Sequence, residues 1–455
     1  MHLRPLGLAA CLWAVPLAAQ SNLPISHRVL ANGLDVIVIE NHAVPLVTVE
    51  VDVRNGSMTE PPEFNGLSHL YEHMFFKANR TIPDQERYLQ RLRQLGAVWN
   101  GTTSEERVNY FFTLGADSLV PALRFMGDAA RFPLFQQAEL ERERPVILSE
   151  FDRNEASPFF HLSQAVSREL WSPGYFSRKN VMGDRTMIAT ATQEKMLTIQ
   201  RRYYVPNNSA LVLAGDITPD RGFQLAEQIF GDWPRSDDPF ATPVPNPPPL
   251  TESRAAIVER PVNSVTLDLA WQGPSVGADP ASTYAADVFS AIVNTETGRF
   301  HQRLVESGLA FGANLSYYTL NHTGPIQIFA QTTPDKLLPL QRAILDEVEH
   351  FADSDYVSQA QLDAARNQVM VEGLFERERP SSLASTVGFW WSVAGLDYYL
   401  TYRPRMQAVT RADIAAYARR YLVGQPHVTG VLISPEARAR IALTPGALLG
   451  REVAP

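Results

Sequence analysis

The chain contains one sequence pattern twice, and this repeat limits its possible folds more than any other feature. The stretch from Val47 to Val51 (VTVEV) returns from Val265 to Leu269 (VTLDL), 218 positions later. The stretch from Arg201 to Val205 (RRYYV) returns from Arg419 to Val423 (RRYLV) at the same offset. Two matches at one offset, about 150 residues apart in each copy, are hard to ascribe to two unrelated amphipathic patterns. We therefore predict two homologous domains.

A proline-rich segment separates the two copies. Seven prolines fall between Pro234 and Pro249. Because proline lacks a backbone donor and fixes φ, such a segment can form neither a helix nor a central strand, and it behaves as a stiff linker. The sequence thus predicts a first domain over residues 21–232, a linker over residues 233–253 and a second domain over residues 254–455.

Hydrophobic periodicity indicates the same mixture of elements in both copies. Alternating apolar residues predict strands from Leu46 to Val53 and from Ile326 to Gln331. Helical periodicity predicts helices from Gln85 to Leu95, from Ser118 to Arg131 and from Leu337 to Phe351. Strand pairs mixed with long helices indicate an α+β fold, built twice, in which helices cover a mostly antiparallel or mixed sheet.

The first copy carries the pattern of a metal site. His69 and His73 are four residues apart, so on a helix both imidazoles lie on one face and can reach one ion. Glu72 lies on the same side, within reach of a water on that ion. The order H-x-x-E-H is the inverse of the commoner H-E-x-x-H and is typical of inverzincin peptidases.

The second copy lacks this pattern. If no gap intervenes, His69, Glu72 and His73 correspond to residues of other kinds, which are Asp287, Ser290 and Ala291. We therefore expect the second domain to have the same fold without the metal site. Its role would then be structural or substrate-facing.

A catalytic zinc site needs a third protein ligand and an open position. Glu143 and Glu150 lie in an acidic, helix-like segment, and their separation of seven residues puts both carboxylates on one face. The alternative is that the two histidines are ordinary helix residues and that Glu150 is one of many surface carboxylates. The order and spacing of the two histidines and Glu72 favour the metal site, and the choice between Glu143 and Glu150 stays open at this point.

With these residues the chain resembles the pitrilysin–insulysin family of zinc peptidases, and in particular its short branch, which is similar to the mitochondrial processing peptidase. In that family a glutamate ligand follows the second histidine by 77 residues, as Glu150 follows His73 here. A further glutamate seven residues before that ligand assists the site, and Glu143 matches it. The stretch from Asn100 to Ser104 resembles the family's edge strand beside the metal. The resemblance extends over essentially the whole mature chain.

The resemblance implies a role for each residue of the motif. His69, His73 and Glu150 would bind Zn²⁺, which polarises a water and the scissile carbonyl. Glu72 would be the general base that takes the proton from the water and passes it to the leaving amine. The substrates implied are peptides or unfolded polypeptides.

Glu143 and Asn100 have alternative interpretations. Glu143 would act beside the metal ligands or on the substrate amine, but together with Glu141 it also fits an ordinary solvated face. Asn100 would bind the substrate backbone, although a structural turn amide fits equally well. Pro145 lies between Glu143 and Glu150 and is expected to kink their helix, so the two carboxylates would align less well than their spacing implies.

The resemblance breaks down at two positions of the second domain. Active members have an arginine and, seven residues later, a tyrosine that hold the substrate near its carbonyl. Here the tyrosine position is Phe311, and the arginine position is Leu304, or Val305 if one residue is deleted. None of these side chains can donate a hydrogen bond, and the nearby Arg303 would point elsewhere on a helix. We therefore expect a zinc endopeptidase subunit whose arginine and tyrosine come from a homologous partner chain.

Two alternatives stay open for the function. One is a non-catalytic scaffold subunit of the same fold, as in respiratory-complex core subunits, which typically lose the metal motif. The other is a self-sufficient homodimer, which is disfavoured because each copy would lack the same arginine and tyrosine. Zinc content separates the first alternative from a peptidase subunit, and activity of the isolated chain separates the second.

The first twenty residues are predicted to be a secretory signal peptide. Arg4 precedes an apolar stretch from Leu6 to Ala14, and small residues at Ala18 and Ala19 suit cleavage. Cys11, the only cysteine, superficially fits a lipoprotein box, but little apolar sequence precedes it, so lipid anchoring is disfavoured. No apolar run reaches the ~20 residues of a membrane span. We expect an exported protein, with the periplasm as the favoured compartment, and without disulfides.

The net charge of −9 bears on the choice of partners. Nucleic-acid-binding proteins present a basic stripe or patch, and nothing of this kind occurs in the chain. The sequence therefore argues against a nucleic-acid partner.

Overall fold

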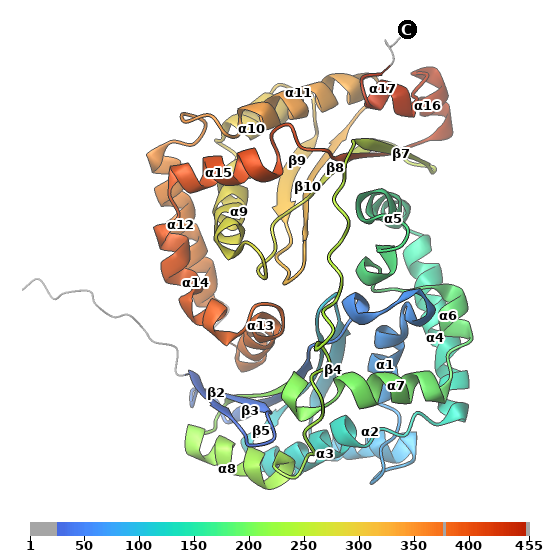
Figure 1. The fold of residues 1–455 in the computed structure, drawn as a ribbon, viewed down its shortest axis with the longest axis vertical. Helices are drawn as coiled ribbons and strands as arrows, with labels where there is room; N and C mark the ends of the chain where they lie inside the picture. The colour runs from blue at the N-terminus through green and yellow to red at the C-terminus, as the bar shows by residue number, and fades with distance from the viewer. Residues whose placement is uncertain (1–24, 376–378, 452–455) are drawn as a thin grey trace, which may run out of the picture.

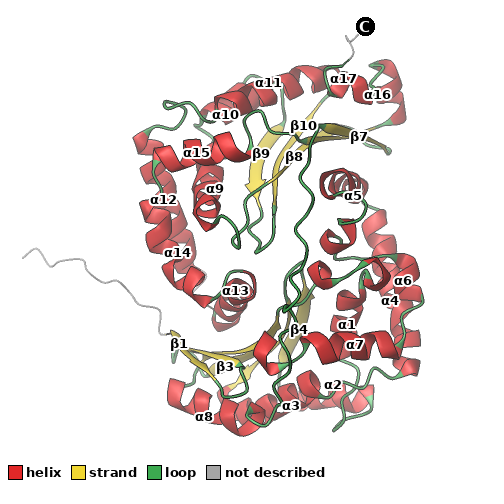
Figure 2. Cartoon of the chain, viewed as in Figure 1, coloured by secondary structure: helices red, strands yellow, loops and turns green. Residues whose placement is uncertain are grey.

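The computed structural model describes residues 25–375 and 379–451. The predicted signal peptide over residues 1–20, with Cys11, lies outside these described residues. The described chain forms two sheets, each covered by helices, which occupy the lower and the upper part of the view in Figure 1 and are coloured by secondary structure in Figure 2. The predicted α+β fold with two sheets is confirmed.

The first sheet has six strands in the order β1-β2-β6-β3-β5-β4. Only β2 and β6 pair in parallel, and the other pairs are antiparallel. The strands are β1 (Ile25–Val29), β2 (Asp35–Glu40), β3 (Leu46–Val53), β4 (Val98–Thr103), β5 (Val108–Gly115) and β6 (Ser209–Gly215).

The second sheet has five strands in the order β7-β11-β8-β10-β9. Only β7 and β11 pair in parallel. The strands are β7 (Arg254–Glu259), β8 (Val265–Gln272), β9 (Gly312–Tyr317), β10 (Pro325–Thr332) and β11 (Val428–Ile433). Apart from β1, the two sheets therefore share one topology, in which β2, β6, β3, β5 and β4 correspond to β7, β11, β8, β10 and β9. The predicted duplication is confirmed at the level of strand order.

The helices of the first half begin and end as follows: α1 (Leu67–Phe75), α2 (Gln85–Gln94), α3 (Leu119–Arg131), α4 (Gln137–Glu155), α5 (Pro158–Trp171), α6 (Arg185–Ala189), α7 (Gln193–Tyr203) and α8 (Pro219–Phe230). Short 3₁₀ turns lie between them: η1 (Ser57–Thr59), η2 (Pro62–Phe64), η3 (Ala116–Ser118), η4 (Phe176–Lys179) and η5 (Pro206–Asn208).

The second half contains α9 (Pro280–Val293), α10 (Arg299–His301), α11 (Leu337–His350), α12 (Gln359–Phe375), α13 (Pro380–Val393), α14 (Leu396–Ala408), α15 (Arg411–Tyr421), α16 (Pro435–Arg440) and α17 (Pro445–Leu448). A π-helical turn, η6 (Gln302–Glu306), and a 3₁₀ turn, η7 (Pro334–Lys336), complete it. No helix of the described residues combines the length and the apolar character that a membrane span requires.

The predicted elements agree closely with the observed ones. The strand predicted from Leu46 coincides with β3, and each end of the other four predicted elements lies within one residue of α2, α3, α11 or β10. The helices α7 and α15, whose equivalent residues are 218 positions apart, also begin alike. Thr192 accepts a hydrogen bond from the backbone of Lys195, and Thr410 from that of Asp413, so a threonine caps each helix.

The chain between α8 and β7 contains neither a helix nor a strand over residues 231–253. Figure 1 shows this segment running in extended form from the lower half of the molecule to the upper half. Its seven prolines explain why it joins neither sheet, because each proline removes a backbone donor.

The two halves exchange one helix each, which the sequence did not predict. Helix α5 of the first half packs against β7, β11 and β8 of the second sheet, and α13 of the second half packs against β3 and β6 of the first. Apolar side chains fill both contacts: Val166 and Val428 belong to one buried cluster, and Val387 and Val212 belong to the other. Each sheet is therefore covered on one face by a helix from the other half.

Candidate metal centre

The helix that carries the two histidines, α1, is held at its N-terminus by a buried acid. The carboxylate of Glu60 accepts hydrogen bonds from the backbone N–H groups of Gly66 (2.7 Å) and Ser68 (2.6 Å). These are groups that a helix leaves unpaired, and a negative charge there is favourable. Burial raises the pKa of Glu60 to about 7 despite these bonds. The apolar face of α1, including Leu70 and Met74, is buried in the first core.

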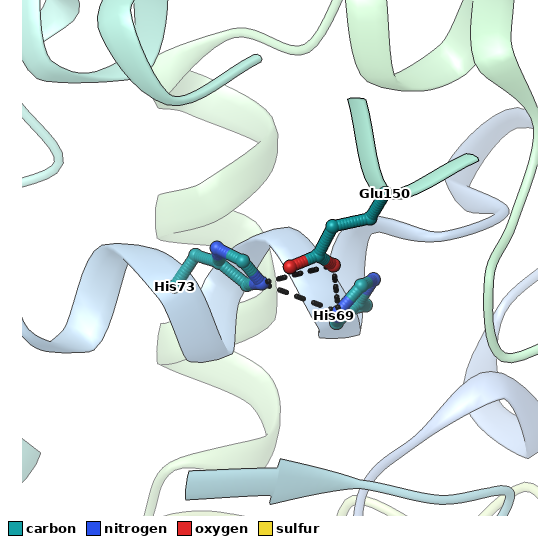
Figure 3. A group of neighbouring side chains, drawn as sticks. All are labelled: His69, His73 and Glu150. Carbon is teal, nitrogen blue, oxygen red and sulfur yellow. Dashed lines mark hydrogen bonds and ion pairs between the residues drawn. The ribbon is translucent and has the colours of Figure 1, made fainter. Parts of the chain in front are cut away.

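The remaining face of α1 brings three potential ligands together. The Nε2 atoms of His69 and His73 are 3.3 Å apart, and Oε2 of Glu150 lies 3.5 Å from the first and 3.7 Å from the second. Figure 3 shows the two imidazoles on one helix with the carboxylate of Glu150 arriving from another segment. Within the described part of the chain, this is the one group of three histidine, cysteine or acidic side chains close enough to share an ion.

The distances within this group fit a zinc ion. Zn–N and Zn–O bonds of about 2.0–2.1 Å in a tetrahedron put neighbouring ligand atoms about 3.4 Å apart, and the three observed separations lie near that value. Two imidazoles and one carboxylate are also a donor set of catalytic zinc sites. Since two imidazole nitrogens this close cannot both carry a proton toward each other, a shared cation suits them better.

The electrostatics of the two imidazoles differ. Burial, and then the neighbouring His73, lower the pKa of His69 to about 4, so its ring is neutral near pH 7 and its lone pair is available. For His73, burial acts in the same direction, but the carboxylates of Glu143, Glu72 and Glu150 outweigh it and raise its pKa. An ion bound to Nε2 of both rings would take the place of a proton on Nε2 of His73, which these carboxylates favour as long as no ion is bound.

Glu143 lies behind His73 and not among the three ligands. Its Oε1 is 2.8 Å from Nδ1 of His73, and its Oε2 is 2.5 Å from Nζ of Lys77. Burial alone would raise the pKa of Glu143, but hydrogen bonds from His73 and Lys77 lower it overall. The sequence analysis missed Lys77. Its spacing gives no signal of this contact, because α1 ends at Phe75, two residues before Lys77.

The expected misalignment around Pro145 is not observed. Helix α4 is a single helix that includes Pro145. Both of its acids reach the same ring, Glu143 at Nδ1 of His73 and Glu150 at the Nε2 side. The hydroxyl of Ser149 donates to the carbonyl of Pro145 at 2.8 Å.

Glu72 lies between the ligands and the edge of the first sheet. Its Oε2 accepts a hydrogen bond of 2.7 Å from the hydroxyl of Thr103 on β4. A Cβ atom on Gly101 would lie 2.9 Å from Cγ of Glu72, so a glycine is needed where β4 passes α1. Burial raises the pKa of Glu72, which suits a general base that must also release its proton.

The edge strand β4 is open on the side away from β5. Asn100 lies on β4, exposed to solvent and paired in register with Phe111. It directly precedes Gly101, and because successive side chains of a strand point to opposite faces, its side chain lies on the other face from the one on which Gly101 and Thr103 meet Glu72. Its amide makes no side-chain hydrogen bond within the described residues that would mark it as a structural turn amide.

The two positions where the expected arginine and tyrosine are missing differ in burial. Leu304 lies in η6 and is fully buried, whereas Phe311 is 63% exposed. Arg303 is bound to acids of α11, with Nη1 2.7 Å from Oε1 of Glu347 and Nη2 against Asp346. Arg303 is therefore engaged in ion pairs within its own half.

The positions equivalent to the motif in the second half do not form such a group. Asp287 on α9 accepts a hydrogen bond of 2.8 Å from the hydroxyl of Tyr402, and burial raises its pKa to about 7. Ser290 has a buried hydroxyl without a partner in the described structure, and Ala291 has no donor atom. The second half thus keeps the helix without the ligands.

Comparison with known proteins finds one family in both halves. Residues 35–179 match the family model "Insulinase (Peptidase family M16)", and residues 190–369 match "Peptidase M16 inactive domain". An uncharacterized zinc protease of Rickettsia felis is 22% identical over 365 residues, which are 79% of this chain and 85% of that protein. A probable mitochondrial-processing peptidase subunit beta of Arabidopsis thaliana is 25% identical over 79% of this chain and 68% of its own length.

Solved structures share the fold. The first half of the periplasmic protease PqqL from Escherichia coli superimposes with a TM-score of 0.76 at 18% identity, over 94% of this chain and 96% of that fragment. The chain spans 50% of the complete PqqL. At this level of identity the likeness concerns the fold alone.

Proposed function

The chain belongs to peptidase family M16, the insulinase family, and we propose that it is the zinc-bearing subunit of an endopeptidase that hydrolyses peptides or unfolded polypeptides. The observation that carries this proposal is the triangle of His69 Nε2, His73 Nε2 and Glu150 Oε2, with separations of 3.3, 3.5 and 3.7 Å. The relative from Rickettsia felis, which is named a zinc protease, supports the choice of zinc.

The residues around the triangle suit peptide hydrolysis. His69, His73 and Glu150 hold the ion, and bound Zn²⁺ supplies the polarisation of a water and of the scissile carbonyl. Glu72 accepts the proton of the attacking water and passes it to the leaving amine. Thr103 holds one oxygen of Glu72 by its hydrogen bond and so leaves the other oxygen for this transfer.

The edge strand β4 supports an extended substrate. An open strand edge presents backbone N–H and C=O groups to which a peptide can add as a further strand. The exposed Asn100 lies on this edge, next to the glycine that abuts Glu72, and would bind the substrate backbone. A folded protein cannot offer a free extended segment, which favours peptides and unfolded chains.

A homologous partner chain would complete this site. Leu304 and Phe311 cannot donate hydrogen bonds to a substrate carbonyl, and Arg303 is bound to Glu347. The chain also spans 50% of the complete PqqL, and the relative from Arabidopsis thaliana is named a subunit. We infer that the missing arginine and tyrosine come from a second, homologous chain.

The test is zinc content and peptide hydrolysis of the full chain, purified without chelators, alone and with the homologue that co-purifies with it. We expect about one zinc per chain, poor hydrolysis by the isolated chain, and recovery on addition of the partner, because each lost donor to a developing oxyanion costs ~10²–10³ in rate. A chain without zinc would refute the metallopeptidase. Full activity of a verified single chain would refute the partner.

A non-catalytic scaffold is the second candidate. The match of residues 190–369 to a domain described as inactive favours it, as do Leu304 and Phe311 at the positions where a carbonyl-binding pair is expected. Such a scaffold would have no need of Glu72. If the complete assembly hydrolyses peptides and loses this activity on Glu72→Gln, the scaffold is excluded.

Export is part of the proposal. It is supported by the signal-like first twenty residues and by the relative PqqL, which is named a periplasmic protease. N-terminal sequencing of the mature protein should begin at Gln20 or Ser21. A mature protein that begins at Met1 would contradict export, and a lipid on Cys11 would indicate membrane anchoring instead.

A further inference from the structure

A half-buried cation, Lys77, lies behind the candidate metal centre, on the far side of His73. The carboxylate of Glu143 bridges two donors: Oε1 lies 2.8 Å from Nδ1 of His73, and Oε2 lies 2.5 Å from Nζ of Lys77. All three side chains are largely withdrawn from solvent, with exposed fractions of 16% for His73, 7% for Glu143 and 16% for Lys77. The ring nitrogen that faces His69 and Glu150 is the other one, Nε2.

The two nitrogens of an imidazole are coupled. The hydrogen bond made by one nitrogen decides which tautomer is present and therefore which nitrogen can bind a metal. When Nδ1–H of His73 donates to Glu143, Nε2 presents its lone pair toward Nε2 of His69 and Oε2 of Glu150. The orientation of the Glu143 carboxylate therefore controls whether His73 can serve as a ligand.

We propose that Lys77 is a positioning residue of the metal centre, which holds the Glu143 carboxylate against Nδ1 of His73 and so keeps Nε2 turned toward the ion. This inference rests on the proposed function, since it requires that the ion binds there. A buried carboxylate without a cation is costly, and a further acid, Glu150, lies on the Nε2 side of the ring. Lys77 supplies the positive charge that lets Glu143 stay in place.

Lys77 is itself held. Its backbone N–H donates to the carbonyl of Met74 at 3.2 Å, directly after the end of α1. The side-chain amide of Gln85 on α2 lies beside Lys77. In the orientation that satisfies both of its polar atoms, the amide oxygen accepts a hydrogen bond from Nζ of Lys77 at 3.1 Å, and the amide nitrogen donates one to Glu139 at 3.2 Å. The ammonium thus lies between two acceptors on α4 and α2, which fixes its position relative to Glu143.

The other cation close to the ligands is differently placed. Arg153 pairs with Oε1 of Glu150 at 3.3 Å, but its side chain is 76% exposed. An exposed pair of this kind contributes little. A plainer role for Lys77 is also conceivable, namely a cation that stabilises the C-terminus of α1. That role would not pass through Glu143, which allows the two to be separated by experiment.

The experiment is the zinc affinity of the full chain, measured by competition with a chelator, for Lys77→Met, Lys77→Arg, Glu143→Gln and the double variant Lys77→Met/Glu143→Gln. Loss of an outer partner of a metal-binding histidine weakens affinity by ~10–100-fold, which we expect for Lys77→Met. Lys77→Arg should recover most of the affinity. In the Glu143→Gln background, Lys77→Met should cost nothing further, because its effect passes through Glu143.

Arg80→Met is the matched control. Arg80 follows Lys77 by three residues and is exposed over the ring of Phe132, so its loss should leave zinc affinity unchanged. Equal zinc affinity of Lys77→Met and the wild type, or an effect that adds in full to that of Glu143→Gln, would overturn the inference. A wild-type chain that binds no zinc would refute the proposed function, and the inference with it.

A second measurement decides the matter if Lys77→Met fails to fold. The ¹⁵N spectra of the histidine side chains of the zinc-loaded wild type report which nitrogen is protonated. We expect His73 to carry its proton on Nδ1 and to bind the metal through Nε2. The opposite assignment would overturn the inference, because Glu143 and Lys77 would then not set the tautomer.

Discussion

Helices α1 and α9 occupy equivalent places in the two halves, yet within the described residues α1 alone contributes to a group of side chains that could hold a metal ion. The position of His69 is taken by Asp287, whose carboxylate accepts a hydrogen bond from Tyr402. The position of Glu150, at the same offset of 218, is taken by Gln368 on α12, which carries no charge. The shared topology therefore does not create the site. In both halves the topology puts two helices side by side, α1 with α4 and α9 with α12. Whether a metal ion could bind there depends on the individual side chains.

The elements that surround the two helices correspond. Helix α1 packs against α4, α6, α7 and β4, and α9 packs against the elements at equivalent places, which are α12, α14, α15 and β9. In the second half the aromatic rings of Tyr284 and Tyr398 stack at 4.8 Å between α9 and α14. The difference between the two helices therefore lies in their side chains: Asp287 of α9 is bound to Tyr402 of α14, whereas the potential ligands of α1 face one another.

The largest effect should come from exchanging ligands. His73→Ala, and equally His69→Ala or Glu150→Gln, leave two ligands and should reduce the zinc content from about one per chain to nearly none. Asp287→Ala, at the position equivalent to His69, should leave it unchanged. Metal analysis of the purified variants measures both. Zinc loss in Asp287→Ala would show that the second half also takes part in metal binding.

The next effect concerns the base. Glu72→Gln keeps all three ligands and should retain zinc, while peptide turnover by the complete assembly falls by ~10²–10⁴ because the proton acceptor is gone. Ser290→Ala, at the equivalent position of α9, is the matched control and should not change turnover. Near-native turnover of Glu72→Gln would mean that another group accepts the proton.

Most of the elements could be predicted from the sequence because they depend on local periodicity and on the repeat. The strand β3 and the helices α2, α3 and α11 follow from the spacing of their apolar residues. The grouping of His69 and His73 follows from helix geometry. Glu150 needed the family resemblance, because two segments 77 positions apart have no local pattern that joins them.

The remaining features depend on contacts between distant segments. Nothing in the periodicity of α5 or α13 indicates that each covers the sheet of the other half. Lys77 has no signal of its own, because its partner Glu143 lies on α4 and only the fold brings the two together. The same holds for Glu60, which caps α1 only because the chain turns back between η1 and Gly66.

The exchanged helices offer a third test of the comparison. A Cβ atom on Gly388 of α13 would lie 2.2–2.6 Å from three atoms of the buried Asp52 carboxylate. On the other sheet, a Cβ atom on Gly430 would approach one methyl of Val166 at 2.2 Å and nothing else closer than 3.0 Å. Gly388→Ala should therefore destabilise the chain by about 1–3 kcal/mol, as overpacking does, and Gly430→Ala by less.

Urea denaturation of the two glycine variants at one pH measures this difference. The same free energy of unfolding for both variants would contradict the expectation that α13 is packed more tightly against Asp52 than β11 is against Val166. A smaller effect for Gly388→Ala would mean that Asp52 can move away from α13 at low cost.

A last effect, of similar size, concerns two fully buried acids at equivalent places in the two sheets, Glu50 on β3 and Asp268 on β8. Glu50 accepts a hydrogen bond of 2.5 Å from Asn109 and lies 3.8 Å from the guanidinium of Arg107. Asp268 accepts hydrogen bonds from the amide of Gln327 at 3.2 and 3.4 Å, and no cation pairs with it in the described structure. The first sheet therefore has one cation for Glu50 and the neighbouring buried Asp52, and burial still raises the pKa of Glu50 to about 7, whereas the described part of the second sheet has no cation for Asp268.

This difference predicts how stability changes with pH. Burial raises the pKa of Asp268 to about 7, against an ordinary value of about 3.9 in the unfolded chain. Between these values the folded state binds one proton more than the unfolded state, so the stability that Asp268 contributes is present at low pH and is lost as the pH rises toward 7. Asp268→Asn removes this loss. Between pH 5 and pH 8, the free energy of unfolding of this variant should therefore rise by on the order of 2 kcal/mol relative to that of the wild type. Glu50→Gln should raise the free energy of unfolding by less, because it removes one of the two acids that face the buried Arg107 and leaves this cation with Asp52 alone. Denaturation curves of the three proteins at pH 5 and pH 8 measure these differences, and parallel changes in the wild type and Asp268→Asn would show that Asp268 is not an uncompensated acid.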